Sequence, residues 1–191
     1  MKQAKLFESH EEPLVYSSLE YSKSEAVALK VEAAISPLCE RIEIVGSIRR
    51  KKKMIGDCDF VISATDDNWA KIVQKLGKAK VICSGQSLIK VNYSIDRGFF
   101  QLDFYRATPT TFGIQELIRT GSADHNIWLA GFAISKGFRL KHSTGLMKDG
   151  VAVAGETEES VFSMLELPCP EPTKREVLEG KPVWLYPQSS N

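Results

Sequence analysis

Two aspartates one residue apart, Asp57 and Asp59, follow a Gly46-Ser47 pair and five consecutive cations that begin at Arg49. In a strand, residues i and i+2 face the same side, so these carboxylates point the same way. Such neighbours repel each other unless a cation lies between them, and Mg²⁺ takes one or two carboxylates together with substrate phosphates. The residues before them can donate hydrogen bonds to a triphosphate. The pattern predicts nucleotidyl transfer; the alternative is a solvated basic turn before a strand.

A third carboxylate, Asp103, interrupts the apolar stretch from Phe99 to Tyr105. Acidic residues are depleted in strands, so this position needs an explanation. Asp103 lies either on the exposed face of an edge strand or next to Asp57 and Asp59. Three carboxylates can hold two Mg²⁺ ions about 3.5–4 Å apart, and Mn²⁺ can substitute. Asp57 and Asp59 would bridge both ions, while Asp103 would bind the catalytic ion and accept the proton of an attacking hydroxyl.

Other kinds of site find little support. The histidines His10, His125 and His142 are far apart and lack a nucleophile motif, and His125 is expected at the surface or in a groove. Neither a Walker loop nor a GxGxxG motif occurs. The cysteines lack the spacing of a zinc site, which favours a reducing compartment; they are Cys39, Cys58, Cys83 and Cys169.

The composition is that of a globular protein, with 191 residues, 43% hydrophobic and 26% charged. A net charge of +1 excludes a polycation, so any nucleic-acid surface must be local. Glu156, Glu158 and Glu159 suggest an acidic patch. No long apolar run is present at the start, which predicts an intracellular protein, cytoplasmic or nucleoid-associated, with a viral or host-cell setting left open.

Periodicity predicts an α+β fold in two parts. Ser22 and Glu25 fit a capping box that starts the first helix, and the strand at 87–93 is a candidate edge strand. The expected helices begin near 22 and cover 67–76, 111–118, 123–136 and 156–165; the expected strands cover 42–45, 57–62, 80–83, 87–93, 99–105, 138–141 and 146–153. The predicted divisions are a polar arm at 1–20, a strand-rich part at 21–107, a mostly helical part at 108–176 and a Pro-rich tail at 177–191.

Several separated motifs together resemble family X DNA polymerases, the group that includes DNA polymerase beta. The likeness rests on Gly46-Ser47-Ile48-Arg49-Arg50 with Gly56-Asp57-Cys58-Asp59, on Gln101-Leu102-Asp103-Phe104, on Thr120-Gly121-Ser122 followed by Asn126, and on Ala154-Gly155-Glu156-Thr157-Glu158-Glu159. The resemblance implies a nucleotidyltransferase-type palm at 21–107, with a mixed β-sheet and flanking helices. A smaller nucleotide-binding subdomain, mostly helical with short strands, would follow at 108–176.

By the same resemblance, eight residues would line the incoming nucleotide. Those at the triphosphate would be Gly46, Ser47, Arg50 and Gly56, those at the sugar Thr120, Gly121 and Ser122, and the one at the base edge Asn126. The chain departs from the family pattern at several positions. Ile118-Arg119 replaces an aromatic pair, which leaves sugar selection open, and Tyr105 replaces a basic partner of the third aspartate.

The resemblance further implies a minimal polymerase, because the lyase domain and the DNA-gripping subdomain that are usual in the family have no counterpart here. DNA phosphates would then meet lysines, for which ordinary solvation is the alternative; the candidates are Lys51, Lys52, Lys53 and Lys141.

The expected function is therefore a DNA-directed DNA polymerase that adds dNMP from dNTP to a DNA 3′-OH and fills short gaps in repair. Its expected partners are dNTP and gapped or primer–template DNA, without a membrane, and it is expected to be a monomer. Two alternatives stay open. One is a template-independent, terminal-transferase-like nucleotidyltransferase, because the Gly-Ser and Asp-x-Asp core is shared across that superfamily. The other is a non-catalytic nucleotide- or DNA-binding protein derived from the fold.

Overall fold

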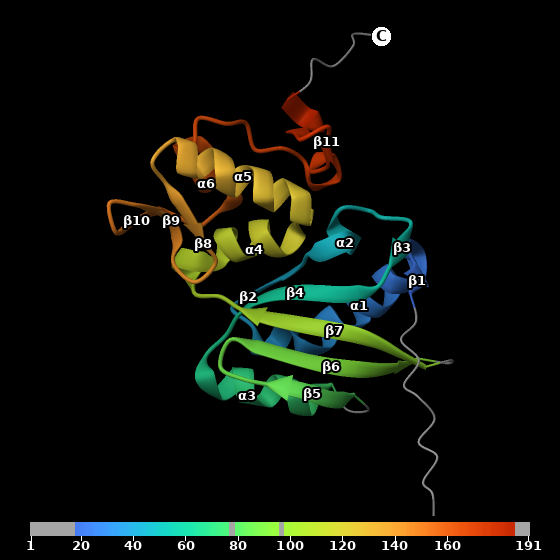
Figure 1. Cartoon of the computed structure of the whole chain (residues 1–191). Helices are drawn as coiled ribbons and strands as arrows, with labels where there is room; N and C mark the ends of the chain where they lie inside the picture. The colour runs from blue at the N-terminus through green and yellow to red at the C-terminus, as the bar shows by residue number, and fades with distance from the viewer. Residues whose placement is uncertain (1–17, 77–78, 96–97, 186–191) are drawn as a thin grey trace, which may run out of the picture.

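A β-sheet and a group of helices form the two halves of the molecule, which a computed structural model describes for residues 18–76, 79–95 and 98–185 (Figure 1). The arm expected at 1–20 and the tail expected at 177–191 therefore lie partly outside the described residues. Within these ranges no helix has the length and apolar character needed to span a membrane.

The lower half in Figure 1 is a mixed five-stranded sheet. Its order is β2 (Arg41–Ile44), β4 (Asp57–Ser63), β7 (Gly98–Arg106), β6 (Leu88–Ile95) and β5 (Lys80–Ser84). Only β4 and β7 pair in parallel; the other neighbours are antiparallel. Alternate residues such as Phe60, Phe100 and Phe104 are fully buried on one face, in a core shared with α1 (Tyr21–Ile35) and α3 (Asp66–Lys75). The predicted α+β fold with a mixed sheet is confirmed.

The sheet corrects one prediction about its edge. The strand expected at 87–93 as an edge is the interior strand β6, paired on both sides. The edge strand on this side of the sheet is β5, all of whose residues are exposed, including Val81 and Ile82. Apolar and polar residues alternate in a similar way in β5 and β6. The order of these strands in the sheet therefore cannot be predicted from their sequences.

The start of α1 corrects a second prediction. The capping box at Ser22 does not form, because the helix already begins at Tyr21 and its N-cap residue, Glu20, makes no side-chain cap. Instead, β1 (Leu19–Glu20) pairs with β3 (Met54–Ile55), and the Tyr21 amide donates to the Lys53 carbonyl oxygen at 3.1 Å. A tertiary contact therefore sets the helix start, in place of the local pattern.

The upper half is built around a second core. Its elements are α4 (Phe112–Thr120), α5 (Ala123–Ser135), α6 (Glu158–Met164) and an antiparallel sheet of β8 (Arg139–Lys141), β9 (Gly145–Lys148) and β10 (Val151–Ala154). The single strand expected at 146–153 is two strands. Asp149 and Gly150 have φ values of 49° and 82° and form the two-residue turn between them, since such hairpin turns require positive φ at both positions.

The last described residues fold back onto the upper half. They include β11 (Val177–Leu178), β12 (Lys181–Pro182) and the side chain of Trp184. The Trp184 ring lies 5.7 Å from the ring of Trp128 and 6.4 Å from that of His125, centroid to centroid. Aromatic contacts at such distances stabilise a fold beyond the area they bury, so this part of the Pro-rich segment is packed against α5.

Replacement of Gly113 by alanine should destabilise the protein by about 2 kcal/mol. Helix α4 passes so close to the start of α6 that a Cβ at Gly113 would lie 2.2 Å from the Thr157 backbone. As a matched control, Gly131→Ala in α5 adds a Cβ with nothing within 4 Å and should stabilise by up to about 1 kcal/mol. Urea unfolding measures both changes. Equal effects of the two substitutions would contradict the close approach of the helices.

Candidate active site

The structure brings the three predicted carboxylates to one face of the sheet. In the parallel pair β4–β7, Asp59 lies in register with Asp103, and Asp57 lies in register with Gln101. The alternating residues Cys58 and Leu102 point the other way, into the core with α1 and α3. The carboxylates therefore line the sheet face opposite that core, where three negative charges are gathered.

Burial and crowding raise the pKa values of two of these groups. Burial raises the pKa of Asp57, and the charge of Asp103 adds to the effect. Burial likewise raises the pKa of Asp59 to about 7, with repulsion from Asp57 and Asp103 contributing. A positive charge between these carboxylates would relieve the repulsion.

Asp103 already has partners for both carboxylate oxygens. Its Oδ1 accepts a hydrogen bond from Gln101 Nε2 at 2.8 Å, and its Oδ2 accepts one from the Tyr105 hydroxyl at 3.1 Å. The ammonium group of Lys90 forms an ion pair with the same Oδ2. Nothing in the sequence pattern had singled out Lys90, which reaches Asp103 from the adjacent strand β6.

The fit to Mg²⁺ is therefore partial. Across the described ranges, no group of three or more His, Cys, Asp or Glu side chains is placed to hold a metal ion together. Asp57 and Asp59 have the chemistry that Mg²⁺ prefers when it also binds substrate phosphates. Asp103 could join them only if Lys90 moved away. The two-ion site with Asp57, Asp59 and Asp103 stays a prediction.

The short helix α2 (Gly46–Arg49) places the predicted triphosphate loop beside these carboxylates. Gly46 has a φ of 68°, and a Cβ there would lie 2.2 Å from Asp59 Oδ2, so only glycine fits. The Ser47 hydroxyl and Arg50 Nε are buried without a hydrogen-bond partner in the described part of the chain. Buried polar groups are nearly always satisfied. Glu176 forms an ion pair with Arg50 Nε at 3.7 Å, which is too long for a hydrogen bond, so both donors are left without a hydrogen-bond acceptor among the described residues. Gly56 is exposed at the far end of the loop.

The predicted sugar-binding segment contacts this loop from the upper half. Arg50 Nη1 donates to the Thr120 carbonyl oxygen, and a Cβ at Gly121 would lie 3.0 Å from the same nitrogen. The Ser122 hydroxyl makes two hydrogen bonds within the protein. It caps α5 by accepting from the His125 amide at 3.3 Å, and it donates to the Arg175 carbonyl oxygen at 3.0 Å. Thr120 and Gly121 thus adjoin Arg50. The Thr120 side chain is buried and its hydroxyl accepts from Arg49 Nη1 at 2.8 Å, so it is engaged within the protein, as Ser122 is.

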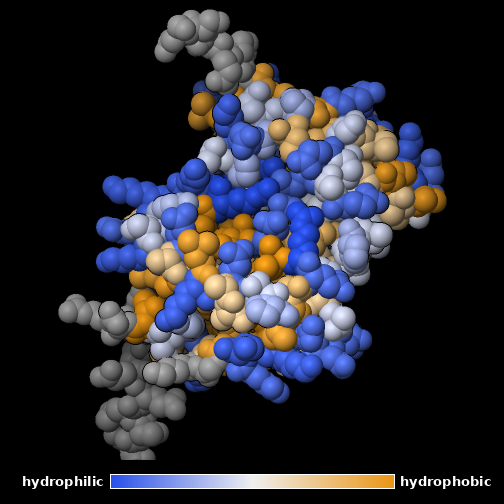
Figure 2. All heavy atoms as spheres, turned by 180° about the vertical axis from the view of Figure 1, so that it is seen from behind, coloured by the Kyte–Doolittle hydropathy of each residue, from blue (hydrophilic) through white to orange (hydrophobic). Residues whose placement is uncertain are grey.

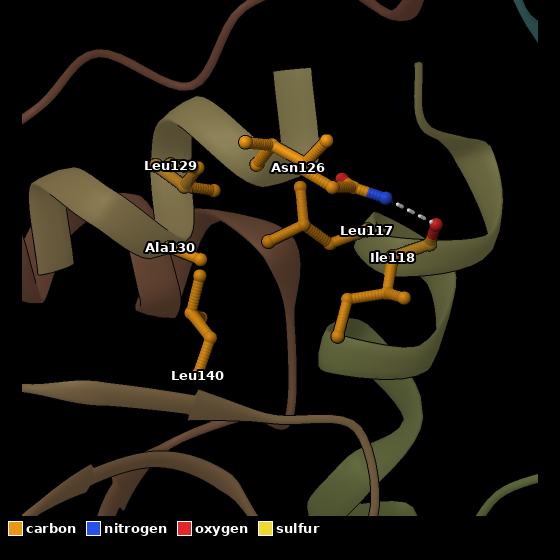
Figure 3. Close-up of a pocket in the computed structure, with 7 residues that line it drawn as sticks. Leu117, Ile118, Asn126, Leu129, Ala130 and Leu140 are labelled. Atoms are coloured by element: carbon orange, nitrogen blue, oxygen red, sulfur yellow. Dashed lines mark hydrogen bonds between the residues drawn. The ribbon is translucent and has the colours of Figure 1, made fainter. Parts of the chain in front are cut away.

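Asn126 borders an apolar pocket of about 250 Å³ between α4, α5 and β8 (Figure 3). Its Nδ2 donates to the Ile118 carbonyl oxygen at 2.7 Å, while its Oδ1 is buried and has no hydrogen-bond partner in the portion of the chain that the structure describes. The remaining lining is aliphatic and consists of Leu117, Ile118, Ile127, Leu129, Ala130 and Leu140. The predicted base-edge contact therefore sits at the margin of a surface that offers one amide and otherwise only hydrocarbon.

Buried ion pairs join the two halves next to the loop. Arg49 contacts Glu116 at 2.9 Å and Glu158 at 2.8 Å, and Arg175 contacts Glu158 at 2.5 Å. Burial pushes the pKa of Glu158 upward, but hydrogen bonds from Arg175 and Arg49 outweigh it and hold the pKa below its usual value. Glu158 is thus a buried partner of two arginines, which corrects the acidic surface patch expected from the sequence. Seen from behind, a band of hydrophilic side chains runs between the halves (Figure 2).

The predicted DNA-contacting lysines differ in their surroundings. Lys51, Lys53 and Lys141 are exposed. Lys52 pairs with Glu176 at 2.5 Å, and the same carboxylate lies 3.7 Å from Arg50 Nε. A role of these lysines at DNA stays a prediction, and Lys52 would first have to leave Glu176.

The sequence suggests that His125 lies at the surface or in a groove. In the structure it is fully buried. It shares the inner stripe of α5 with Leu129 and Ala133 and is covered by Trp184, which lies far along the chain. Neither ring nitrogen has a hydrogen-bond partner within residues 18–76, 79–95 and 98–185. Burial, with a contribution from the nearby Arg175 charge, lowers the pKa of His125 to about 4.

Acid should therefore destabilise the protein through His125. Between pH 6.5 and pH 4 the unfolded chain binds a proton at this side chain and the folded chain does not, so stability falls as the pH falls. The loss from pH 7 to pH 5 should be about 2 kcal/mol. Urea unfolding of wild type and His125→Phe at both pH values isolates this contribution. A pH dependence that is the same in the two proteins would contradict it.

A comparison with protein families matches residues 117–176 to the model described as DNA polymerase beta thumb. The matched segment runs from the end of α4 through α5, the small sheet and α6 to the ion-paired Arg175. The sheet with the three aspartates lies outside it. A comparison with curated proteins gave no match.

Proposed function

We propose that this family X polymerase-like protein is a DNA-directed DNA polymerase that adds dNMP from dNTP to a DNA 3′-OH and fills short gaps during repair. The observation that carries the proposal is a pair of buried donors at α2 and its C-cap, Ser47 Oγ and Arg50 Nε, which have no hydrogen-bond partner among the described residues. They lie beside two carboxylates whose pKa values are raised by burial. Unpaired donors next to crowded acids suit a phosphate that arrives together with a divalent cation.

Each residue then has a role in the reaction. Ser47 and Arg50 hold the triphosphate, and Gly46 and Gly121 let backbone and ligand approach closely. Asp57 and Asp59 are the residues that would hold Mg²⁺, which when bound lowers the pKa of the attacking hydroxyl and offsets phosphate charge. Asp103 would accept the hydroxyl proton once its carboxylate is free. The thumb resemblance supports DNA as the acceptor.

One observation favours a second candidate, a nucleotide- or DNA-binding protein without catalysis. Asp103 is already neutralised by Lys90, and a carboxylate with such a partner has no need of a metal ion. Catalysis therefore depends on whether that ion pair opens when substrates bind.

Extension of a primer on DNA with a one-nucleotide gap tests the proposal. Each dNTP is supplied singly with Mg²⁺ against each template base, and Ser47→Ala serves as the variant. Addition of only the complementary nucleotide, weakened in Ser47→Ala through a higher KM for dNTP, is the expected result. Equal addition opposite every base would indicate a template-independent transferase. DNA binding without any addition would contradict the proposal and favour the second candidate.

A further inference from the structure

We propose that Lys90 acts as a tethered cation that occupies Asp103 in the free protein and must leave before Asp103 can join Asp57 and Asp59 in binding a divalent ion. The importance of this competition for catalysis rests on the proposed function. The ion pair itself stands independently of that function.

The geometry shows how fully Asp103 is engaged. Its side chain is buried, with 1% of the residue exposed. Lys90 and Asp103 are directly paired across β6 and β7, so the sheet register itself brings the ammonium group to the carboxylate. With Gln101 on one oxygen and Tyr105 and Lys90 on the other, the carboxylate has no oxygen without a donor.

The charge of Lys90 extends beyond Asp103. It lies close enough to Asp57 and Asp59 to favour the charged form of each. Lys90 therefore contributes positive charge at all three carboxylates from within the sheet, together with Arg119 at Asp59 and Arg50 at Asp57. The ammonium group offsets part of the negative charge, although burial and mutual repulsion still raise the pKa values of Asp57 and Asp59.

Lys90 differs from Asp103 in its freedom to move. Its side chain is 32% exposed and ends a flexible four-carbon stem. Asp103 is held within β7 and between fixed donors. Opening of the pair would therefore move the lysine into solvent while the carboxylate stays in place. A metal ion that binds Asp103 must compete with this lysine, so the free protein should bind divalent ions weakly.

Titration of Mn²⁺ alone into the protein, without nucleotide or DNA, tests the competition. Lys90→Met removes the charge at similar length, and Lys90→Arg keeps it. We expect Lys90→Met to bind Mn²⁺ about tenfold more tightly than wild type, whereas Lys90→Arg should resemble wild type. Asp103→Asn in the Lys90→Met background should abolish the gain, because the added affinity depends on that carboxylate.

Thermal unfolding with and without Mn²⁺ gives a second readout. Lys90→Met should have a lower Tm than wild type without metal and a larger rise in Tm when Mn²⁺ is added. If Lys90→Met does not fold, Lys90→Gln, which keeps a hydrogen-bond donor, replaces it in both measurements. Equal Mn²⁺ affinity in the neutral variants and wild type would overturn the proposal. Neither readout uses DNA synthesis, so a protein without polymerase activity could still pass this test.

Discussion

Asp59→Asn is expected to lower the rate of nucleotide addition by about 10³-fold or more while leaving the fold intact. The substitution keeps the size and shape of the side chain beside Gly46 but removes one of the two carboxylates best placed for Mg²⁺. Because burial and repulsion raise the pKa of Asp59, the neutral amide relieves unfavourable charge. The Tm should therefore stay level or rise while activity falls. Single-turnover extension and thermal unfolding of the same preparation separate the two effects.

Asp67→Asn is the matched control, since Asp67 is an exposed carboxylate in the first turn of α3, away from the site. It should extend primers at the wild-type rate. If Asp59→Asn retained more than a few per cent of wild-type activity, Asp59 would not be a metal ligand in the reaction, and the proposed role of the carboxylate pair would be wrong.

The largest effect on stability is expected from Glu158→Gln, which should lower the free energy of unfolding by about 3 kcal/mol. Glu158 is 4% exposed and lies between the guanidinium groups of Arg49 and Arg175, the latter 1% exposed. A neutral amide would leave two cations facing each other without the charge that compensates them. Urea unfolding at neutral pH gives the difference directly.

The neighbouring Glu159 provides the comparison for this substitution. It is exposed on the same helix, so Glu159→Gln should change stability by less than about 0.5 kcal/mol. A loss below about 1 kcal/mol in Glu158→Gln would show that the buried ion pairs are replaceable by neutral hydrogen bonds at little cost.

The strands and the aspartates could be predicted because they depend on local patterns. The alternation around Asp103 fixes which residues of β7 share a face, and the spacing of Asp57 and Asp59 does the same for β4. Lys90 could not be found in this way, because its contact depends on the register of β6 against β7. Glu158 looked like part of an acidic surface for a related reason: its arginine partners are distant in sequence. His125 was misplaced because Trp184, which covers it, lies outside any local window.

The parallel pairing of β4 and β7 has a consequence for how the protein folds. In the chain, α3, β5 and β6 lie between these two strands, so the contact that gathers the carboxylates closes a long loop. Contacts of this kind form slowly compared with helices and hairpins. The repulsion among the three carboxylates should therefore develop late on the folding pathway, when β4 pairs with β7, and should oppose only that step. Salt or divalent ions should then act mainly on the rate of unfolding, with little effect on the early collapse of the chain.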